Sequence, residues 1–262
     1  MPIDYNHSRN LHTTEGALAA FRALLGDKPP ASILDVGCGT GTWLRAALDG
    51  GVTDILGIDG IQIPPGQLLI PMNAFRCLDL TEPVELGRKF GLVLCLEVAE
   101  HLAQSHAETL LRTLVRHSDL IIFSAACPGQ PGQHHVNCQW PEWWQKRFNA
   151  LGYVCEDNLR PKLWDASTVE PWYRQNIFTA YKDPGIASLE PRLKAMIHPE
   201  LLDSFTSPSS ETAILRSIET GGKPVAWYLS IVFKALAEKV KRRARTLSDG
   251  RNEVRSSRQR PI

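Results

Sequence analysis

The chain has 262 residues, with 29 lysine and arginine residues against 28 aspartate and glutamate residues and a net charge of +1. Apolar residues make up 43% and charged residues 22%, which is ordinary for a globular protein and excludes a disordered, collagen-like or coiled-coil chain. No stretch reaches the ~18 apolar residues that a membrane span requires, and the polar N-terminus resembles no secretory signal. We therefore expect a cytoplasmic protein with one large domain, or one domain and an appendage.

Apolar residues at helical spacing predict a helix over 14–25, followed by a short apolar strand over 31–37 and, after a glycine-rich turn, a helix over 43–49. Further strands are predicted at 54–60, 75–80, the start of 90–102, 120–126, 153–157 and 176–182, with helices at 104–116 and 141–152. This alternation favours parallel βαβ units and a doubly wound α/β sheet. Ligands in such sheets bind beyond the carboxyl ends of the strands.

The sheet domain is expected to cover residues 1–182, a helical extension 183–246, and a basic, disordered tail 247–262. The six cysteines form no C-x-x-C pair, and several lie in apolar runs: Cys38, Cys77, Cys95, Cys127, Cys138 and Cys155. We expect them to be buried, reduced thiols.

The strongest motif is ILDVGCGTGTW, residues 33–43, in which Gly37, Gly39 and Gly41 follow Asp35 at alternate positions. Glycines allow positive φ and close approach of the backbone to a ligand, and the following helix offers free N–H groups. The spacing is not the G-x-G-x-x-G of dinucleotide-binding proteins, and no G-K-[ST] follows. A carboxylate before the loop would repel a pyrophosphate, but it suits a ligand that carries an ammonium group.

The segment ILDVGCGTG resembles the first motif of class I S-adenosylmethionine-dependent methyltransferases, and the resemblance extends over roughly residues 14–182. It implies a seven-stranded, mostly parallel Rossmann-like sheet and S-adenosylmethionine as the cofactor. It also implies that Asp59 accepts from the ribose hydroxyls and Asp79 from the adenine amino group, with Leu80 beside the adenine. The alternative for Asp35, Asp59 and Asp79 is that each is a turn or cap residue.

Residues 94–101, LCLEVAEH, resemble the fourth motif, which lines both the methionine end of the donor and the acceptor pocket. The resemblance places Glu97 nearest the donor. The expected donor-binding residues are therefore the following: Asp35, Gly37, Cys38, Gly39, Gly41, Asp59, Gly60, Asp79, Leu80 and Glu97.

Three histidines are candidate general bases, because imidazole titrates in the useful pH range: His101, His134 and His135. His134 and His135 lie in a polar loop after the fifth strand, which resembles loops of bacterial methyltransferases that act on small molecules or sugars. We expect methyl transfer to a hydroxyl of a small metabolite, sugar or natural-product intermediate. The alternative is that these histidines are exposed, capping or packing residues.

Two other functions stay open. Glu97, Glu100 and His101, with a later histidine such as His135, resemble the metal cluster of small-RNA 3′-terminal 2′-O-methyltransferases, which implies a metal-assisted RNA methyltransferase. The second histidine segment matches that family only partly, so no metal ligand is expected. The other alternative is a non-catalytic nucleoside-binding module, against which the full set of donor-site acids argues.

The C-terminal region is basic. From Lys223 onward there are 11 basic and 3 acidic residues, against 18 and 25 before it. The apolar run 225–233 permits packing on the catalytic domain or on a second subunit as a homodimer, peripheral contact with an anionic membrane, or nucleic-acid binding. The acidic body argues against a nucleic-acid partner, and a small-molecule acceptor is expected. Residues 161–176 either close over the acceptor or form an ordinary amphipathic helix.

Overall fold

The computed structural model describes residues 13–26 and 28–206, and the single residues 225, 228, 229, 232 and 239. The chain forms two compact units, Met1–Thr206 and Ser207–Ile262. The five single residues are helical and fall within the extension expected to be helical over 183–246. The rest of that extension after residue 206 and the basic tail lie outside the described residues.

The first unit contains all seven expected strands: β1 (Ser32–Val36), β2 (Asp54–Asp59), β3 (Phe75–Cys77), β4 (Leu92–Leu96), β5 (Leu120–Ser124), β6 (Tyr153–Glu156) and β7 (Phe178–Lys182). Its α-helices are α1 (Thr14–Leu25), α2 (Thr42–Asp49), α3 (Ala107–His117), α4 (Pro141–Ala150), α5 (Arg160–Leu163), α6 (Pro171–Asn176) and α7 (Pro199–Thr206). Short 3₁₀ turns lie at η2 (Pro65–Gln67), η3 (Met72–Ala74), η4 (Ala99–His101) and η5 (Gln104–His106). The helices expected at 14–25, 43–49, 104–116 and 141–152 form to within a few residues.

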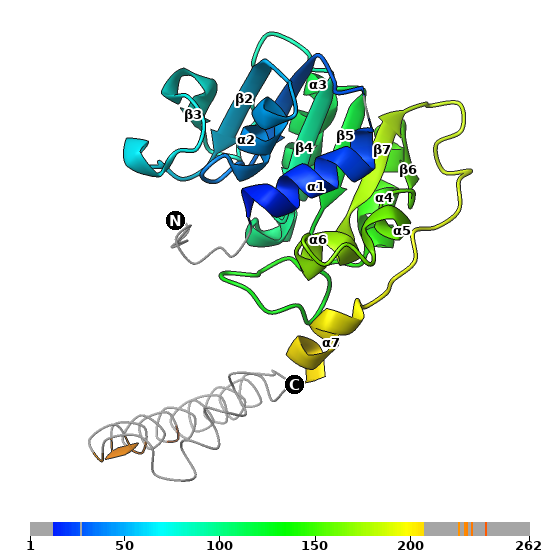
Figure 1. The fold of residues 1–262 in the computed structure, drawn as a ribbon. Helices are drawn as coiled ribbons and strands as arrows, with labels where there is room; N and C mark the ends of the chain where they lie inside the picture. The colour runs from blue at the N-terminus through cyan, green and yellow to red at the C-terminus, as the bar shows by residue number, and fades with distance from the viewer. Residues whose placement is uncertain are drawn as a thin grey trace, which may run out of the picture. The chain divides into compact units, whose positions relative to one another are not determined.

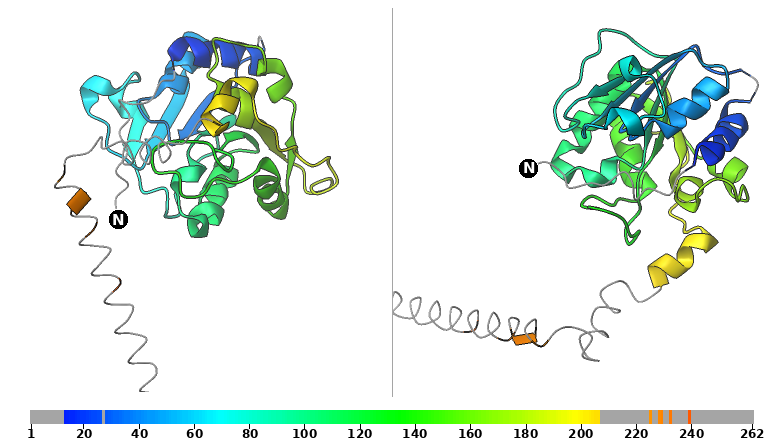
Figure 2. Two further views of the ribbon diagram at one scale, coloured as in Figure 1. Left: turned by 90° about the horizontal axis from the view of Figure 1, so that it is seen from below. Right: turned by 60° about the vertical axis from the view of Figure 1, so that its left-hand side comes forward.

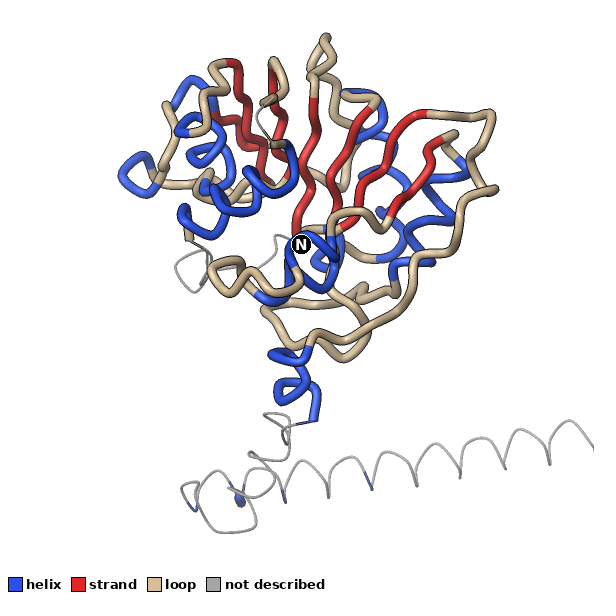
Figure 3. The backbone as a smooth tube through the Cα atoms, turned by 45° about the vertical axis from the view of Figure 1, so that its right-hand side comes forward, coloured by secondary structure: helices blue, strands red, loops and turns tan. Residues whose placement is uncertain are grey.

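The strands make one sheet in the order β3-β2-β1-β4-β5-β7-β6 (Figures 1 and 3). All neighbouring pairs are parallel except those of β7, which runs antiparallel to β5 and to β6. This confirms the predicted doubly wound, seven-stranded, mostly parallel sheet. Because the order reverses between β1 and β4, their carboxyl ends border the crevice in which such sheets bind ligands.

Helices cover both faces of the sheet (Figure 2). One core packs α1, α2, α5 and α6 against side chains such as Ile33 and Leu94, and the other packs α3 and α4 against neighbours such as Leu34 and Cys95. Strand β4 is buried along its whole length, as its continuous apolar run predicted. The segment before β7 contributes Tyr173 to the first core, which fits an amphipathic helix.

Two details differ from expectation. All six cysteines are free, but Cys77 is exposed and Cys138 is half-buried, since Cys77 ends the short edge strand β3. Residues 183–206 belong to the first unit rather than to an extension, because Glu190 accepts hydrogen bonds from Gln145 and Asn149 of α4.

Among the described residues, no helix has the length and apolarity needed to cross a membrane.

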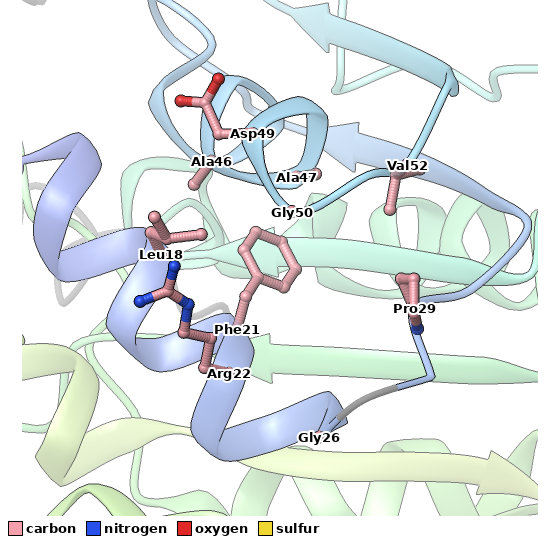
Figure 4. A pocket seen from close by; sticks show the side chains of 10 residues that line it. All are labelled: Leu18, Phe21, Arg22, Gly26, Pro29, Ala46, Ala47, Asp49, Gly50 and Val52. Carbon is pink, nitrogen blue, oxygen red and sulfur yellow. The ribbon is translucent and has the colours of Figure 1, made fainter.

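A cavity of about 300 Å³ lies between α1 and α2 (Figure 4). Its lining includes Phe21, Pro29 and Val52. Pro29 and Val52 come just before β1 and β2, so this cavity lies at the amino ends of the strands. It is therefore separate from the ligand-binding edge.

Candidate functional site

The glycine loop after β1 is held tightly against its neighbours. Gly37 has φ +81°, and a Cβ there would lie 2.3 Å from Cγ2 of Val98. Its N–H donates to the carbonyl of Ile58 at 2.7 Å. Gly41 is the N-cap of α2 and has φ +85°, and a Cβ there would lie 2.9 Å from Ile70. A side chain at Gly37 or Gly41 would collide with Val98 or Ile70. The loop therefore presents only backbone atoms at the carboxyl end of β1.

Two buried carboxyl groups lie beside this loop. Asp35 and Asp59 are 3% and 6% exposed. Asp59 accepts hydrogen bonds from the N–H groups of Gly39 at 2.8 Å and Ile61 at 2.9 Å. Burial, and then the charge of Asp59, raise the pKa of Asp35 to about 8. A bound cation would reverse this shift, because it stabilises the ionised carboxylate.

The remaining expected donor residues take different positions. The Cys38 side chain packs against β2, since a Cβ on Gly57 would lie 2.6 Å from its sulfur; only its backbone can face a ligand. Leu80 is buried in the core. Asp79 is exposed, and its Oδ1 accepts from the N–H and hydroxyl of Thr81 at 2.9 and 2.6 Å, which lowers its pKa. Gly60 is open, with only the Leu78 carbonyl oxygen reaching 4.0 Å from a Cβ built there.

Glu97 follows β4 and is held by amide side chains. Its backbone has φ +55°, and its N–H donates to the carbonyl and hydroxyl oxygens of Ser124 at 3.0 and 3.1 Å. Its carboxylate accepts from Gln130 Nε2 at 2.8 Å and Asn176 Nδ2 at 3.0 Å. Burial raises the pKa of Glu97, and these hydrogen bonds oppose the shift. A non-glycine residue at positive φ is strained unless its surroundings fix it, so these bonds orient the carboxylate.

Gln130 and Asn176 were not predicted as site residues. Asn176 also donates to Gln130 Oε1 at 2.9 Å, and Gln175 Nε2 lies 3.3 Å from the same oxygen. The only signal in the sequence is the run of polar residues Arg174, Gln175 and Asn176 directly before an apolar strand, and all three are buried.

The three candidate histidines divide into two groups. His101 and His135 face each other edge to face, with ring centroids 5.0 Å apart, whereas His134 is exposed, with φ +53°. Burial lowers the pKa of His101 to about 4 and lowers that of His135. Both half-buried rings are therefore neutral near pH 7 and able to accept a proton.

The histidine loop is tied to the turn after β4. The N–H groups of Val136 and Asn137 donate to the Glu100 carbonyl at 2.9 and 3.0 Å. Side-chain ligand atoms of Glu100, His101 and His135 lie within 4.8 Å of one another. The fold thus brings the fourth motif and the histidine loop together.

A family model described as a methyltransferase domain matches residues 9–158. The chain belongs to this methyltransferase family. The match covers more than half of the sequence and confirms the resemblance to class I methyltransferases, whose methyl donor is S-adenosylmethionine.

Individual similarities to this methyltransferase are more distant. Ribosomal RNA large subunit methyltransferase E of Caulobacter sp. (strain K31) is 38% identical over 56 residues, which is 21% of this chain and 23% of that protein. The chain therefore aligns with less than a quarter of that curated relative.

Among solved structures, a plantazolicin methyltransferase in complex with a triazolic desmethylPZN analog and SAH is 16% identical, with a TM-score of 0.49, over 67% of this chain and 87% of that chain. Magnesium protoporphyrin IX methyltransferase from Synechocystis PCC 6803 with bound SAH is 19% identical, with a TM-score of 0.49, over 65% and 82%. A sugar N-methyltransferase from Streptoalloteichus sp ATCC 53650 is 15% identical, with a TM-score of 0.48, over 67% and 89%.

Proposed function

We propose that this methyltransferase transfers a methyl group from S-adenosylmethionine to a hydroxyl group of a small metabolite, sugar or natural-product intermediate. The observation that carries the proposal is the convergence of two kinds of side chain at one sheet edge. Buried carboxyls lie at the carboxyl ends of β1 and β2, and a pair of neutral imidazoles lies beyond β4 and β5. The first suits a cationic donor, and the second suits an acceptor that must lose a proton.

The donor side fits S-adenosylmethionine. The backbone turn at Gly37 leaves no room for a side chain, and Asp35 is a buried acid whose ionisation a cation would favour. We assign Asp35 to the amino group of the donor, Asp59 to the ribose hydroxyls and Asp79 to the adenine amino group. When bound, S-adenosylmethionine supplies a methyl group on a positively charged sulfur and leaves as the neutral thioether.

Asp59 also has a structural role, in addition to the proposed contact with the ribose. Its two oxygens hold the N–H groups of Gly39 and Ile61, so it shapes the turn in addition to the role that we assign it at the ribose. Glu97 is assigned to the methionine end of the donor, where Gln130 and Asn176 fix its direction.

The acceptor side is built from the histidine loop. Nδ1 of His135 lies 3.0 Å from the Gln130 carbonyl, and a carbonyl only accepts, so Nδ1 carries the hydrogen and Nε2 carries the lone pair. A hydroxyl that forms a bond to the methyl carbon must lose its proton, and His135 Nε2 is the group we assign to accept it. Exposed Val136 and Trp140 on the same loop offer apolar surface for a small acceptor.

No described feature favours RNA as the acceptor. The similarity to a ribosomal RNA methyltransferase covers only 56 residues, and the charged groups around the site are mainly acidic. Six free cysteines favour a reducing compartment, which is why we place the reaction in the cytoplasm.

The test is a transfer assay on the full chain with radiolabelled S-adenosylmethionine and separate pools of metabolites, glycans and RNA. We expect label in the metabolite or glycan pool, together with S-adenosylhomocysteine. His135→Asn should lower kcat by ~100-fold, whereas His134→Asn, in the same loop but exposed, should retain activity. Label confined to RNA, donor binding without turnover, or full activity of His135→Asn would contradict the proposal.

A further inference from the structure

Glu100 is a buried carboxyl group that lies against the carboxyl group of Glu97. It is 0% exposed, and neither of its oxygens makes a well-aligned hydrogen bond to a described residue, although the N–H groups of Glu100 and Ala126 lie close to it. Buried polar groups are hydrogen-bonded as a rule, and leaving a carboxyl unpaired costs several kcal/mol unless a proton or a cation compensates it. Two carboxyl groups buried side by side therefore need a shared proton or a cation to balance them.

The imidazole rings of His101 and His135 lie beside the carboxyl group of Glu100. The ligand atoms of Glu100, His101 and His135 lie within 4.8 Å of one another. His135 donates from Nδ1 to the Gln130 carbonyl, which is the outer hydrogen bond that orients a metal-binding histidine and leaves Nε2 to the ion. The loop carbonyls of Gln133 and His134 act on the His101 ring in the same way.

We propose that Glu100, His101 and His135 form a binding site for a divalent transition-metal ion, with Zn²⁺ the best match. Two imidazole nitrogens and one carboxylate oxygen are a catalytic zinc ligand set, and three protein ligands leave one position open. Tetrahedral ligands at ~2.1 Å from zinc lie ~3.4 Å apart, so separations of up to 4.8 Å in the cluster must shorten by as much as ~1.4 Å. The His135 ring can supply this movement, since it is carried on a loop.

Glu97 is not part of this ligand set, although it belongs to the same E-x-x-E-H run. Both of its oxygens accept hydrogen bonds from amides, one from Gln130 and one from Asn176. Glu97 contacts the Glu100 carboxyl, but only Glu100 belongs to the cluster with the two histidines. Glu97 serves the donor side, and Glu100 serves the ion.

The consequence for catalysis rests on the proposed function. With the acceptor oxygen as the fourth ligand, the ion lowers the pKa of the hydroxyl, whose proton passes to water. The oxygen lone pair then forms the bond to the methyl carbon, and the carbon–sulfur electron pair stays on sulfur. His135 acts in that state as a ligand, and it is the proton acceptor only when the site lacks the ion.

Gly132 supports the site without being a ligand. A Cβ at this position would lie 2.0 Å from Nε2 of His135, so the ring uses space that any side chain would fill. Gly132→Ala should displace the ring while leaving every ligand residue in the chain.

The experiment measures binding of Zn²⁺ itself, without donor or acceptor. The purified full chain is stripped with a chelator, exchanged into buffer and titrated with Zn²⁺ by calorimetry. The bound metal is then counted by elemental analysis. We expect one ion per chain at micromolar concentration and a rise in melting temperature with Zn²⁺. Co²⁺ should give the visible spectrum of a low-coordinate nitrogen and oxygen site.

His135→Asn and Glu100→Gln should each weaken Zn²⁺ binding by more than the ~10–100-fold that loss of an outer partner costs, and Gly132→Ala should weaken it measurably. The matched control is His134→Asn, one residue away and exposed, where asparagine tolerates the positive φ. It should bind Zn²⁺ like the wild type. Circular dichroism checks that each variant is folded.

Absence of binding to the wild type, or equal loss in His134→Asn and His135→Asn, would overturn the metal site. These readouts do not depend on turnover. Zinc binding in a chain that methylates nothing would leave the site standing and refute the proposed function. Turnover by a chain that binds no ion would do the reverse.

Discussion

Replacing Asp35 by asparagine should change how the stability of the protein depends on pH. Asp35 is 3% exposed, and burial followed by the charge of Asp59 raises its pKa to about 8. The folded protein therefore keeps a proton that the unfolded chain has already released. The stability that the protonated Asp35 carboxyl gives the folded protein is fully present below pH 3.8, the ordinary pKa of the side chain. It is lost as the pH rises towards 8. Asparagine does not ionise, so Asp35→Asn lacks this pH-dependent contribution to stability.

The magnitude follows from the same values. Between pH 3.8 and about 8, each pH unit removes ~1.4 kcal/mol from the free energy of unfolding of the wild type. From pH 5 to pH 7 the wild type should thus lose ~2.7 kcal/mol relative to Asp35→Asn. Groups that titrate alike in both proteins cancel in this difference.

Urea unfolding of both proteins at pH 5, 6 and 7 measures the difference directly. The gap should move in favour of the variant by ~1.4 kcal/mol for each pH unit. A gap that stays constant with pH would refute the reasoning, because the carboxyl group would then titrate alike in the folded and unfolded chains.

The affinity for the donor should respond to Asp35→Asn in the opposite direction from the free energy of unfolding. If the carboxylate of Asp35 holds the cationic donor, binding restores its ordinary acidity and releases close to one proton at pH 7. Calorimetry in two buffers of different protonation enthalpy counts that proton. Asp35→Asn should release none and bind the donor more weakly, even though it is the more stable protein at this pH. Equal proton release from both proteins would remove Asp35 from the donor site.

Two further changes test the donor site. Asp59→Asn should weaken donor binding by ~10–100-fold, since charge-assisted bonds to hydroxyl groups are worth ~1–3 kcal/mol; unchanged affinity by calorimetry would show that Asp59 only shapes the turn. Gly37→Ala should lower the free energy of unfolding by ~2–4 kcal/mol, because its Cβ would lie 2.3 Å from Val98 and its φ is +81°. A melting temperature equal to that of the wild type would contradict the close packing of this turn.

The sequence predicted those parts of the molecule that depend on local pattern. The strand ending at Val36, the glycines that follow it and the helix that begins at Thr42 are neighbours in the chain, so their residue types report their conformation directly. The position of Asp59 follows in the same way, because β2 ends there. Parallel strands bring their carboxyl ends to one edge, which is why local motifs sufficed to place Asp35 and Asp59, the acids expected at the donor site, near each other.

The hydrogen bonds that hold the Glu97 carboxylate could not be predicted, because they come from residues far away in the chain. Gln130 lies 33 residues and Asn176 79 residues from Glu97. Glutamine in a loop and asparagine before a strand are each common on a protein surface, and nothing local marks them as buried partners of a carboxylate. The difference between His134 and His135 is similar, since adjacent residues in an irregular loop point in directions that only the folded backbone determines.

The same reasoning explains why the catalytic domain continues beyond β7. The N–H of His198 donates to Gln175 Oε1 at 2.8 Å, and the buried guanidinium of Arg174 pairs with Glu200. Gln175 in turn contacts Gln130, which holds Glu97. A domain that ended at residue 182 would leave buried Arg174 without its carboxylate, at a cost of several kcal/mol. The segment around His198 is therefore part of the scaffold that orients Glu97, and its sequence carries no pattern that would reveal this role.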